Sequence, residues 1–331
     1  MKYKVVYFVH SYYPATHGIA IHLYNLLKHI NLPYLVITAE GMGEHVIARK
    51  FFRIPGFSSL EVPHPENIKD LLTLDYEIVH VHGYGNIYSF LGALIGHLRK
   101  KKVVWTIHGI PQKGIFFTLY DLFARPLLNR SIVIGVSKQT RKLTTRFIHI
   151  PNGVELRECA ESYKDQIAVG YVGRLDPDKQ VDRIIKEVTE FPIVIVGPDE
   201  GIKKDLEKLA QNKQVTFLDP VPYEHISKIY CKLRYVILPS KYEGFPMTML
   251  ESLAHKRPFV STPVGEVPDF LKEMFGDGWE KYIIKDNIQK TLDRLEEEEL
   301  ERELEQAYQK LKKYSWKKIA ERTREVYEMG K

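Results

Sequence analysis

The stretch SKYEGFPMTMLE, residues 240–251, places two carboxylates, Glu243 and Glu251, on either side of a Gly-Phe-Pro turn. A strand-like run, YVILP at 235–239, precedes it. Pro246 suits the first turn of a helix, because its missing N–H is no loss there. We therefore expect Glu243 in a loop and Glu251 more than a turn inside a helix. At a rise of about 1.5 Å per residue, the two carboxylates lie on the order of 10 Å apart.

The start of this helix is a potential anion site, because its first backbone N–H groups point outward and the helix dipole reinforces them. An acid, an anion-binding helix start and a second acid fit a nucleoside diphosphate sugar. Glu243 would accept hydrogen bonds from sugar hydroxyls, and Glu251 from a ribose diol. An ordinary turn acid followed by a surface glutamate would give the same pattern, so the motif alone leaves both interpretations open. The N–H groups concerned lie near Phe245, Met247 and Thr248.

A second motif, GYVGRLDPDKQVDRII, leaves a strand through Gly173 and presents Arg174 and Lys179 before a helix. Two cations on one loop are well placed to neutralise a diphosphate leaving group. The alternative is a solvated loop whose cations pair with Asp176 and Asp178. These two acids also form a D-x-D pair, which metal-dependent transferases use, but there it typically ends a strand without two cations beside it. We expect no metal here.

The elements that must position these residues alternate between short apolar runs and amphipathic segments. Near-continuous apolar strands separated by helices indicate parallel sheets covered on both faces. We expect an α/β fold with two doubly wound domains that face a central cleft, and ligands of such sheets bind beyond the carboxyl ends of the strands. The expected strands are 3–9, 34–38, 78–82, 103–107, 132–136 and 147–150, then 167–173, 193–197, 215–218, 235–239 and 258–262.

The domain boundaries follow from this rhythm. Residues 1–150 form the first domain, the polar stretch 151–166 reads as a linker, and residues 167–313 form the second domain. Residues 314–331 form a last helix that we expect to begin at Ser315. Residues 87–100 and 113–130 are helical in pattern, and we expect the second of these to be a core helix.

Composition narrows the class of protein. The chain has 331 residues, and no apolar run reaches the roughly 18 residues of a membrane span. The first apolar run is too short for a signal peptide, and two cysteines are too few for a disulfide framework, so we expect a reducing cytoplasmic location. Residues 1–150 carry 18 Lys and Arg against 8 Asp and Glu, which suggests an anionic partner for the first domain; a chance surface bias is the alternative.

With these observations in place, the chain resembles the retaining nucleotide-sugar glycosyltransferases of the GT-B fold, family 4. The resemblance rests on five motifs in the expected order: VHVHG, TIHG, PNGV, VGRLDPDK and the E-x7-E of YEGFPMTMLE. It covers almost the whole chain and two Rossmann-like domains. Each motif alone is weak, but the ordered set is specific.

The resemblance implies a role for each matched residue. His108, Glu243, Arg174 and Lys179 match the catalytic positions, with His108 facing the donor sugar. Glu251 matches the acid that binds the ribose. It implies no cofactor other than the sugar nucleotide as co-substrate, and no metal. The implied donor-binding set is Gly18, Gly173, Arg174, Lys179, Val221, Glu243, Gly244, Phe245, Met247, Thr248 and Glu251.

Some positions depart from the family pattern. The family usually has Gly-Gly where this chain has His17-Gly18, which puts phosphate contact by that loop in doubt. Gln180 and Lys256 each replace a usual glycine, and Asp219-Pro220 replaces a glycine near the expected base site. None of these departures touches a charged contact residue, so we expect activity with an altered donor choice.

The function expected from the resemblance is transfer of a hexose from a UDP- or GDP-linked donor to a lipid, glycan or other hydroxyl acceptor. A sugar-nucleotide epimerase, a phosphorylase, or a silent sugar-nucleotide-binding protein are the alternatives. The basic first domain favours an anionic acceptor and a peripheral contact at the inner membrane face, with Arg99-Lys100-Lys101-Lys102 and 113–130 as contacts. The same basic run could instead complement a helix dipole. Nucleic acid is not expected, because no stacking platform accompanies the charge.

Overall fold

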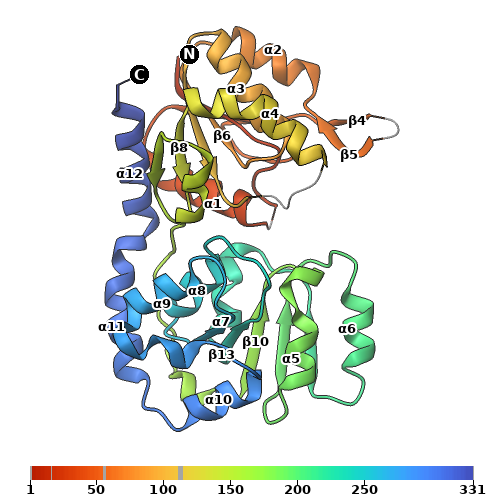
Figure 1. Ribbon diagram of the computed structural model, residues 1–331, viewed down its shortest axis with the longest axis vertical. Helices are drawn as coiled ribbons and strands as arrows, with labels where there is room; N and C mark the ends of the chain where they lie inside the picture. The colour runs from red at the N-terminus through yellow and green to blue at the C-terminus, as the bar shows by residue number, and fades with distance from the viewer. Residues whose placement is uncertain (1, 16, 55–56, 111–114, 331) are drawn as a thin grey trace. The chain divides into compact units, whose positions relative to one another are not determined.

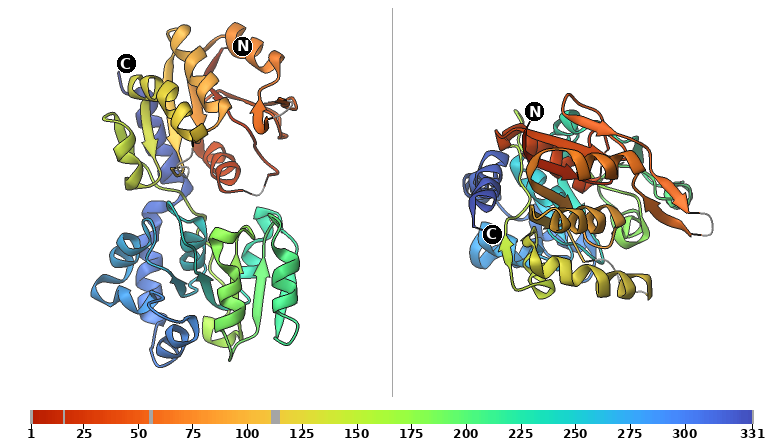
Figure 2. Two further views of the ribbon diagram at one scale, coloured as in Figure 1. Left: turned by 45° about the vertical axis from the view of Figure 1, so that its right-hand side comes forward. Right: turned by 90° about the horizontal axis from the view of Figure 1, so that it is seen from above.

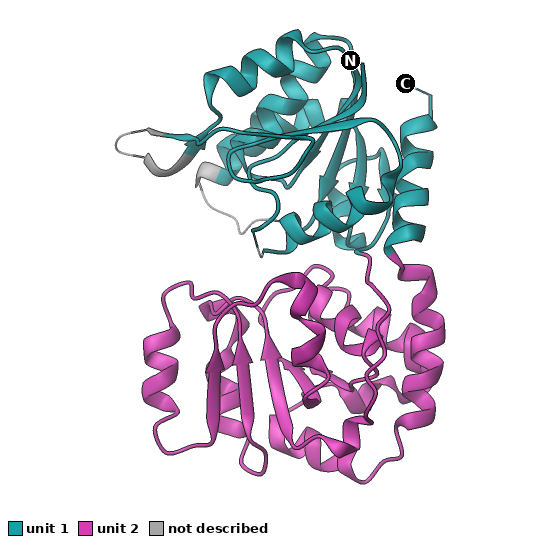
Figure 3. Ribbon diagram, turned by 180° about the vertical axis from the view of Figure 1, so that it is seen from behind, with its two compact units in different colours: residues 1–152, 316–331 teal, residues 153–315 magenta. Residues whose placement is uncertain are grey.

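A computed structural model of the chain describes residues 2–15, 17–54, 57–110 and 115–330. It divides into two compact units. Unit 1 comprises residues 1–152 and 316–331, and unit 2 comprises residues 153–315 (Figure 3). Each unit is an α/β sandwich built on one parallel sheet, with helices flanking the strands (Figures 1 and 2). This is the Rossmann-like pattern expected from the alternation of apolar runs and amphipathic segments.

Unit 1 contains a seven-stranded parallel sheet in the order β3-β2-β1-β6-β7-β8-β9. Chain order reverses between β1 and β6, which are neighbours in the sheet. A separate antiparallel pair, β4 and β5, lies outside this sheet. The strands are β1 (Tyr3–Phe8), β2 (Tyr34–Thr38), β3 (Val46–Ala48), β4 (Phe52–Ile54), β5 (Phe57–Val62), β6 (Tyr76–His82), β7 (Lys102–Ile107), β8 (Ile132–Gly135) and β9 (Phe147–His149).

The helices of unit 1 pack closely on this sheet. Gly92 and Gly96 let one helix approach β6, because a Cβ at either position would lie within 2.5 Å of a valine side chain of that strand. The last helix of the chain belongs to this unit, where the Tyr327 hydroxyl lies 2.8 Å from the Tyr7 hydroxyl. The helices are α1 (Gly18–Ile30), α2 (Pro65–Thr73), α3 (Ile87–Leu98), α4 (Ile115–Arg130), the 3-10 turn η1 (Lys138–Leu143) and α12 (Trp316–Glu328).

Unit 2 contains a five-stranded parallel sheet in the order β12-β11-β10-β13-β14. Its strands are β10 (Ala168–Val172), β11 (Ile193–Val196), β12 (Val215–Leu218), β13 (Leu233–Leu238) and β14 (Phe259–Ser261). Its helices are α5 (Val181–Glu187), α6 (Lys203–Leu209), α7 (Ser227–Tyr230), α8 (Met247–Ala254), α9 (Val267–Phe275), α10 (Ile288–Glu296) and α11 (Glu301–Leu311). Its 3-10 turns are η2 (Tyr163–Asp165), η3 (Pro177–Lys179), η4 (Tyr223–His225), η5 (Gly276–Tyr282) and η6 (Lys312–Tyr314).

The stretch 151–166, expected to be a linker, is largely tied into unit 2. The Val154 backbone N–H donates to the Tyr314 carbonyl at 2.9 Å, and Arg157 donates to the Glu224 carbonyl at 3.2 Å. Tyr314 itself packs against Phe245 in unit 2. The chain therefore passes from unit 1 to unit 2 after residue 152 and returns after residue 315.

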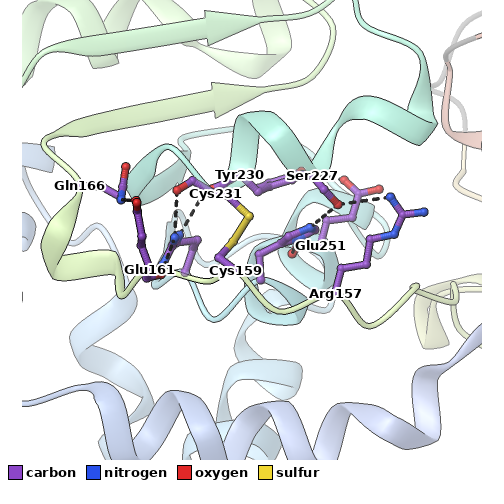
Figure 4. The surroundings of a disulfide bond; sticks show 10 residues. Arg157, Cys159, Glu161, Gln166, Ser227, Tyr230, Cys231 and Glu251 are labelled. Carbon is purple, nitrogen blue, oxygen red and sulfur yellow. Dashed lines mark hydrogen bonds between the residues drawn. A yellow bond between two sulfur atoms is a disulfide. The ribbon is translucent and has the colours of Figure 1, made fainter.

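The two cysteines pair with one another, although their small number led us to expect no disulfide framework and a reducing location. Cys159 and Cys231 form a disulfide across 72 positions of sequence, with their Cα atoms 5.4 Å apart. The bond joins the stretch before β10 to the residue that follows α7 (Figure 4). The count of two cysteines said nothing about their distance in space, because the fold alone brings these two segments together.

The helix α4 also differs from its expectation. Ala124, Leu127 and Leu128 are buried against the core, as a core helix requires. Leu122 and Phe123, however, are 66% and 64% exposed. The expectation of a core helix is therefore wrong for its outer face. No helix among the described residues combines the length and the apolar character needed to cross a bilayer.

Candidate functional site

Two motif loops of unit 2 meet at one edge of its sheet. The strands β10 and β13 are parallel neighbours, although the chain forms β11 and β12 between them. This is a topological switch point, where successive connections turn to opposite sides and open sheets of this type bind ligands. The loop after β10 carries Arg174 and Lys179, and the loop after β13 carries Glu243.

The structure brings Lys179 and Glu243 into direct contact. The Lys179 Nζ lies 2.6 Å from Glu243 Oε1, and the Ser240 hydroxyl donates to the same oxygen at 2.8 Å. Their side chains are only 17% and 10% exposed. A charged pair of this kind is held more firmly than a surface ion pair. Lys179 therefore does not simply pair with Asp176 or Asp178 on a solvated loop.

Arg174 occupies the same loop but is more exposed. Its guanidinium lies 3.2 Å from an Asp176 carboxylate oxygen, and the Tyr171 hydroxyl donates to its backbone carbonyl at 2.6 Å. The other Asp176 oxygen accepts from the Asp178 N–H and so caps the turn η3. The D-x-D pair thus contributes at least one acid to local structure. Gly173 itself is approached closely by Gly197, where a Cβ would lie 1.8 Å from the Gly173 carbonyl oxygen.

The helix α8 starts directly after the second motif loop. Pro246 is its N-cap residue and makes no side-chain capping hydrogen bond to the first turn. The Thr248 hydroxyl donates to the Val172 carbonyl at 3.0 Å, which fastens the helix start to the end of β10. Phe245 is buried and stacks on Tyr314 with their ring centroids 5.9 Å apart. The start of α8 therefore lies at the same sheet edge as the two cations.

Glu251 is buried in α8, so the alternative of a surface glutamate is wrong. Its side chain accepts a hydrogen bond from the Tyr230 hydroxyl at 2.7 Å. Burial raises the pKa of Glu251 above its ordinary value, and the tyrosine bond opposes that rise. The Glu251 backbone carbonyl accepts from His255 Nδ1, whose other nitrogen lies 2.7 Å from the Ser227 hydroxyl. Residues of α7 thus hold the acid that the motif supplies.

Gly265 supports the second loop and was missed by sequence reasoning. Its φ of +58° lies in the left-handed region, and a Cβ there would lie 2.2 Å from the Glu243 carbonyl oxygen. The next residue, Glu266, donates its N–H to the Gly244 carbonyl at 3.0 Å. No motif marks this glycine, because its partner lies in a different loop, on the far side of α8 and β14 in the chain. Tyr230 was missed for the same reason.

At two positions where the family usually has glycine, this chain keeps the left-handed backbone conformation that glycine favours. Gln180 has a φ of +50° and Lys256 a φ of +53°. Non-glycine residues adopt this region at some cost in free energy. Lys256 Nζ lies 2.9 Å from Glu158 and 2.6 Å from Glu305, which fixes its side chain. The turn after Lys179 therefore survives the loss of the glycine.

Val221, the expected contact of the nucleotide base, does not lie at the switch point between β10 and β13. Val221 follows β12 and is half-buried, and β11 separates β12 from β10. Asp219, which replaces a usual glycine, is exposed and lies 3.4 Å from Lys203 Nζ. The structure therefore brings Val221 to the outer strand of the sheet, two strands away from the Arg174 loop.

The expected residues of unit 1 lie around its own switch point, between β1 and β6. Gly18 begins α1, a Cβ added to it would meet no atom within 4 Å, and it is not among the described glycines with positive φ. His17 is the N-cap of α1 and accepts from the Ala20 N–H at 3.4 Å. His17 has a φ of −85° and a ψ of 155°, so the Gly-to-His change requires no glycine-only backbone geometry at position 17.

His108 follows β7 and is half-buried beside two other histidines. Its Nε2 lies 3.1 Å from His82 Nδ1, and its ring lies edge-on to His22 with centroids 4.7 Å apart. Burial lowers the pKa of His22 to about 4 and of His80 to about 3, and it lowers the pKa values of His82 and His108 well below the ordinary value. These imidazoles are neutral at physiological pH. The sequence motifs gave a role to His108 and included His82 in VHVHG without a role, and they missed His22, which comes from another element.

Comparison with known proteins agrees with this architecture. The family model for glycosyl transferases group 1 matches residues 155–318, and the model for glycosyltransferase family 4 matches residues 16–158. An uncharacterized glycosyltransferase of Methanocaldococcus jannaschii is 26% identical over 96% of both chains. The GPI3 subunit of phosphatidylinositol N-acetylglucosaminyltransferase from Saccharomyces cerevisiae is 25% identical, covering 99% of this chain and 83% of the relative.

Solved structures share the fold at lower identity. Anabaena HepE in complex with UDP-glucose superposes with a TM-score of 0.78 at 16% identity, covering 98% of this chain and 99% of that one. Sucrose-phosphate synthase from Thermosynechococcus elongatus gives a TM-score of 0.75 at 15% identity, with 98% of each chain covered. Two family models that follow one another along residues 16–318, on a pair of Rossmann-like units, lead to one conclusion. The chain belongs to the GT-B glycosyltransferases of family 4.

Proposed function

We propose that the protein transfers a hexose from a nucleoside diphosphate sugar to a hydroxyl acceptor with retention of the anomeric configuration. The observation that carries the proposal is the contact between Lys179 and Glu243 at the switch point between β10 and β13. It joins the loop expected to bind the diphosphate to the loop expected to bind the sugar. A lysine beside a carboxylate suits a ligand in which phosphate oxygens lie next to sugar hydroxyls. The phosphate would pair with the lysine, and the hydroxyls would donate to the carboxylate.

The proposed catalytic effect is electrostatic. Departure of the nucleoside diphosphate builds negative charge on its phosphates, and Arg174 and Lys179 would stabilise that charge together with the start of α8. Asp176 orients Arg174, and Ser240 orients Glu243. Because these groups are already positioned, little reorganisation is needed when charge develops. As the family resemblance implies, backbone groups at this edge would contact the donor. They belong to Gly173, Gly244, Phe245, Met247 and Thr248.

The sugars would be held by the acids and by unit 1. Glu243 would accept from donor sugar hydroxyls, and Glu251 from the ribose diol. His108 would contact the donor sugar through a neutral imidazole, and the Gly18 backbone would approach the phosphates. In a front-face substitution the departing phosphate oxygen takes the acceptor proton, so the proposal needs no side-chain base. The proposal likewise needs no metal ion for transfer.

We favour UDP over GDP for the donor. Anabaena HepE, which shares the fold, was solved with UDP-glucose, and the yeast relative is named as an N-acetylglucosaminyltransferase. The base would be bound near Val221 through main-chain groups. The expected base site after β12 carries Asp219 and Pro220 where the family usually has a glycine. We therefore expect the choice of donor base to be the property in which this chain differs from its family.

The proposed acceptor is carried by a lipid, and α4 is the proposed membrane contact. Leu119, Leu122 and Phe123 are 53%, 66% and 64% exposed and lie on one face of α4 at helical spacing. This outer ridge belongs to the basic half of the chain, which suits anionic lipid. The yeast relative is named as a subunit of phosphatidylinositol N-acetylglucosaminyltransferase. A peripheral contact with the inner membrane face is part of this proposal.

The basic run at 99–102 contributes less than the ridge. Arg99 donates to the carbonyls of Leu71 and Leu74 at 2.9 and 2.8 Å, and Lys102 is buried and donates to the Tyr327 carbonyl at 2.8 Å. These two cations therefore serve helix ends within unit 1. The membrane proposal accordingly rests on α4.

Calorimetry tests the donor assignment. Purified protein is titrated with UDP-glucose, UDP-N-acetylglucosamine and GDP-mannose, and we expect one site with the tightest binding for a UDP-sugar. Arg174→Ala and Glu251→Ala should weaken binding at least tenfold, whereas Lys186→Ala, an exposed cation on α5 paired with Asp182, should not. Donor binding unchanged in Arg174→Ala and Glu251→Ala would overturn the assigned site.

A second measurement separates transfer from silent binding. Slow release of free sugar and nucleoside diphosphate shows activated donor, and NMR of the first product identifies its anomer. Release of the inverted anomer would contradict the retaining mechanism. Binding without any release would indicate a silent sugar-nucleotide-binding protein, and appearance of an epimerised sugar nucleotide would indicate an epimerase.

Vesicle flotation tests the membrane contact. We expect the protein to float with vesicles of phosphatidylglycerol and phosphatidylcholine but not with phosphatidylcholine alone. The double variant Leu122→Glu/Phe123→Glu should remain in the soluble fraction. The control Tyr242→Glu alters an exposed aromatic side chain of unit 2, which is 65% exposed, and should float normally. Equal flotation of the α4 variant would remove α4 as the contact.

A further inference from the structure

Three histidines of unit 1 converge from α1, β6 and the end of β7. One nitrogen each of His22, His82 and His108 lies within 4.8 Å of the others. Their ring centroids are 4.7, 5.4 and 5.7 Å apart. Three imidazoles on one tetrahedral ion, with bonds of about 2.0–2.1 Å, place their centroids roughly 5 Å apart. We infer that this trio, named here the histidine site, binds one divalent transition-metal ion of the zinc class.

The hydrogen bond of His22 orients it as a ligand. Its Nδ1 lies 2.9 Å from the Asn152 Oδ1, and both side chains are buried. An amide oxygen only accepts, so Nδ1 carries the proton and Nε2 presents its lone pair. Metal-binding histidines use the same arrangement, in which the second nitrogen donates to an oxygen acceptor that fixes the tautomer and the ring.

The other two histidines leave polar capacity unused. His82 Nδ1 and His108 Nε2 are 3.1 Å apart, close to the roughly 3.3 Å that separates two nitrogen ligands of one tetrahedral zinc ion. The second nitrogen of His82, Nε2, is buried and finds no hydrogen-bond partner among the described residues. Buried polar atoms are nearly always paired. Because Nδ1 and not Nε2 of His82 lies at ligand spacing from His108, the unpaired Nε2 marks a missing hydrogen-bond partner beside the ring and does not itself mark the ion.

The donor set selects the kind of ion. Three neutral imidazoles without a carboxylate suit zinc, copper, nickel or cobalt, and not magnesium or calcium. The neighbouring His80 is not a ligand, because its nitrogens already contact the Tyr327 hydroxyl at 2.6 Å and the Thr106 hydroxyl at 2.7 Å. His108 is the least buried of the three, and the trio supplies three of the four ligands of a tetrahedral ion.

Metal binding would also affect transfer, and this consequence rests on the proposed function. An ion on His108 withdraws its lone pair from the donor sugar. We therefore expect zinc to inhibit transfer, with an inhibition constant equal to the dissociation constant measured by direct binding. Binding itself does not depend on the assigned reaction.

Cobalt spectroscopy tests the site directly. Protein without an affinity tag is stripped with a chelator and titrated with Co²⁺ in the absence of donor. We expect one equivalent to produce the visible bands of tetrahedral cobalt, and zinc to displace it. His22→Gln and His108→Gln should abolish the bands, and Asn152→Ala should lower the affinity roughly tenfold, as loss of a supporting hydrogen bond does. His29→Gln, exposed on the same helix α1, is the matched control and should bind as the parent does.

The outcomes separate cleanly. Absence of tetrahedral Co²⁺ bands and of zinc binding by calorimetry would overturn the site, as would binding unchanged in His108→Gln. Far-UV circular dichroism identifies any variant that fails to fold, and His108, the least buried of the three, keeps the test decisive if His22→Gln misfolds. Metal binding without donor turnover would refute the proposed function and leave the histidine site standing.

Discussion

The two switch points of this protein use the same topology for opposite kinds of chemistry. In unit 2, the loops after β10 and β13 present Lys179 and Glu243 as a charged pair at hydrogen-bond distance. In unit 1, the ends of β6 and β7 present buried neutral imidazoles with strongly lowered pKa values. The topology of a parallel sheet determines where a ligand site lies, but the residues of its loops determine whether the site is charged or neutral. In this protein the switch point of unit 2 carries a charged pair, and that of unit 1 carries neutral imidazoles.

The two units also differ in how they are held together. Unit 2 has a covalent link, the Cys159–Cys231 disulfide, beside the helix that positions Glu251. Unit 1 instead anchors its last helix through a buried hydrogen-bond chain from Tyr7 through Tyr327 to His80. Substitutions in each unit show whether these differences are as large as the geometry suggests.

The largest expected effect is loss of the disulfide. Cys159→Ser removes the covalent cross-link, so the unfolded chain gains conformational entropy. For a separation of 72 positions, the chain-entropy account gives a loss of about 4 kcal/mol in the free energy of unfolding. Chemical unfolding of unit 2, with and without reductant, measures it. The parent protein under reductant should match the variant, and the variant itself should not respond to reductant. Equal stability of oxidised and reduced parent would show that the bond adds nothing.

The next effect concerns the charged pair. Lys179→Ala should lower the turnover of the donor by about 10²–10³-fold, the usual loss when one preorganised electrostatic group is removed from a developing anion. Release of nucleoside diphosphate from saturating donor measures it. Lys186→Ala serves as the control, since that cation lies exposed on α5. A loss below about threefold would mean that Lys179 only holds Glu243 in place.

The sequence revealed most of the sheets because their strands are buried on both faces and read as continuous apolar runs. It did not reveal β3, β4 and β5, which are short strands whose pairing depends on neighbours elsewhere in the chain. The charged residues of the site were found because each lies in a compact local motif. Gly265, Tyr230 and the disulfide were not found, because each acts through a partner that only the fold brings near.

A smaller effect is expected in the buried hydrogen-bond network of unit 1, which consists of Tyr7, Tyr327 and His80. Tyr327→Phe removes the hydroxyl that contacts both Tyr7 and His80 and leaves these buried groups short of a partner. Loss of such bonds costs about 1–3 kcal/mol of unfolding free energy. Urea unfolding measures it, with Tyr242→Phe at an exposed position as the control. If donor turnover fell while the stability was unchanged, the network would serve the reaction instead of the fold.

The smallest expected effect has the opposite sign and isolates the cost of the buried acid in unit 2. Burial raises the pKa of Glu251 in the folded state, so ionisation is disfavoured there relative to the unfolded chain. This destabilisation is present above the folded pKa and disappears below the unfolded value of about 4.3. Glu251→Gln should therefore be more stable than the parent at neutral pH, and the difference should vanish toward about pH 4.

Urea unfolding across this pH range measures the difference, and Glu207→Gln on the exposed face of α6 controls for the change in net charge. Calorimetry on the same variant should show weaker donor binding, because glutamine replaces one of the two acceptor oxygens of the carboxylate with an NH2 donor and cannot accept from both hydroxyls of a ribose diol through both of its ends. A gain in stability with a loss in binding would mean that unit 2 keeps a costly buried charge for its ligand. A parallel loss of both would assign Glu251 to the fold, through its bond with Tyr230, and would remove it from the ribose site.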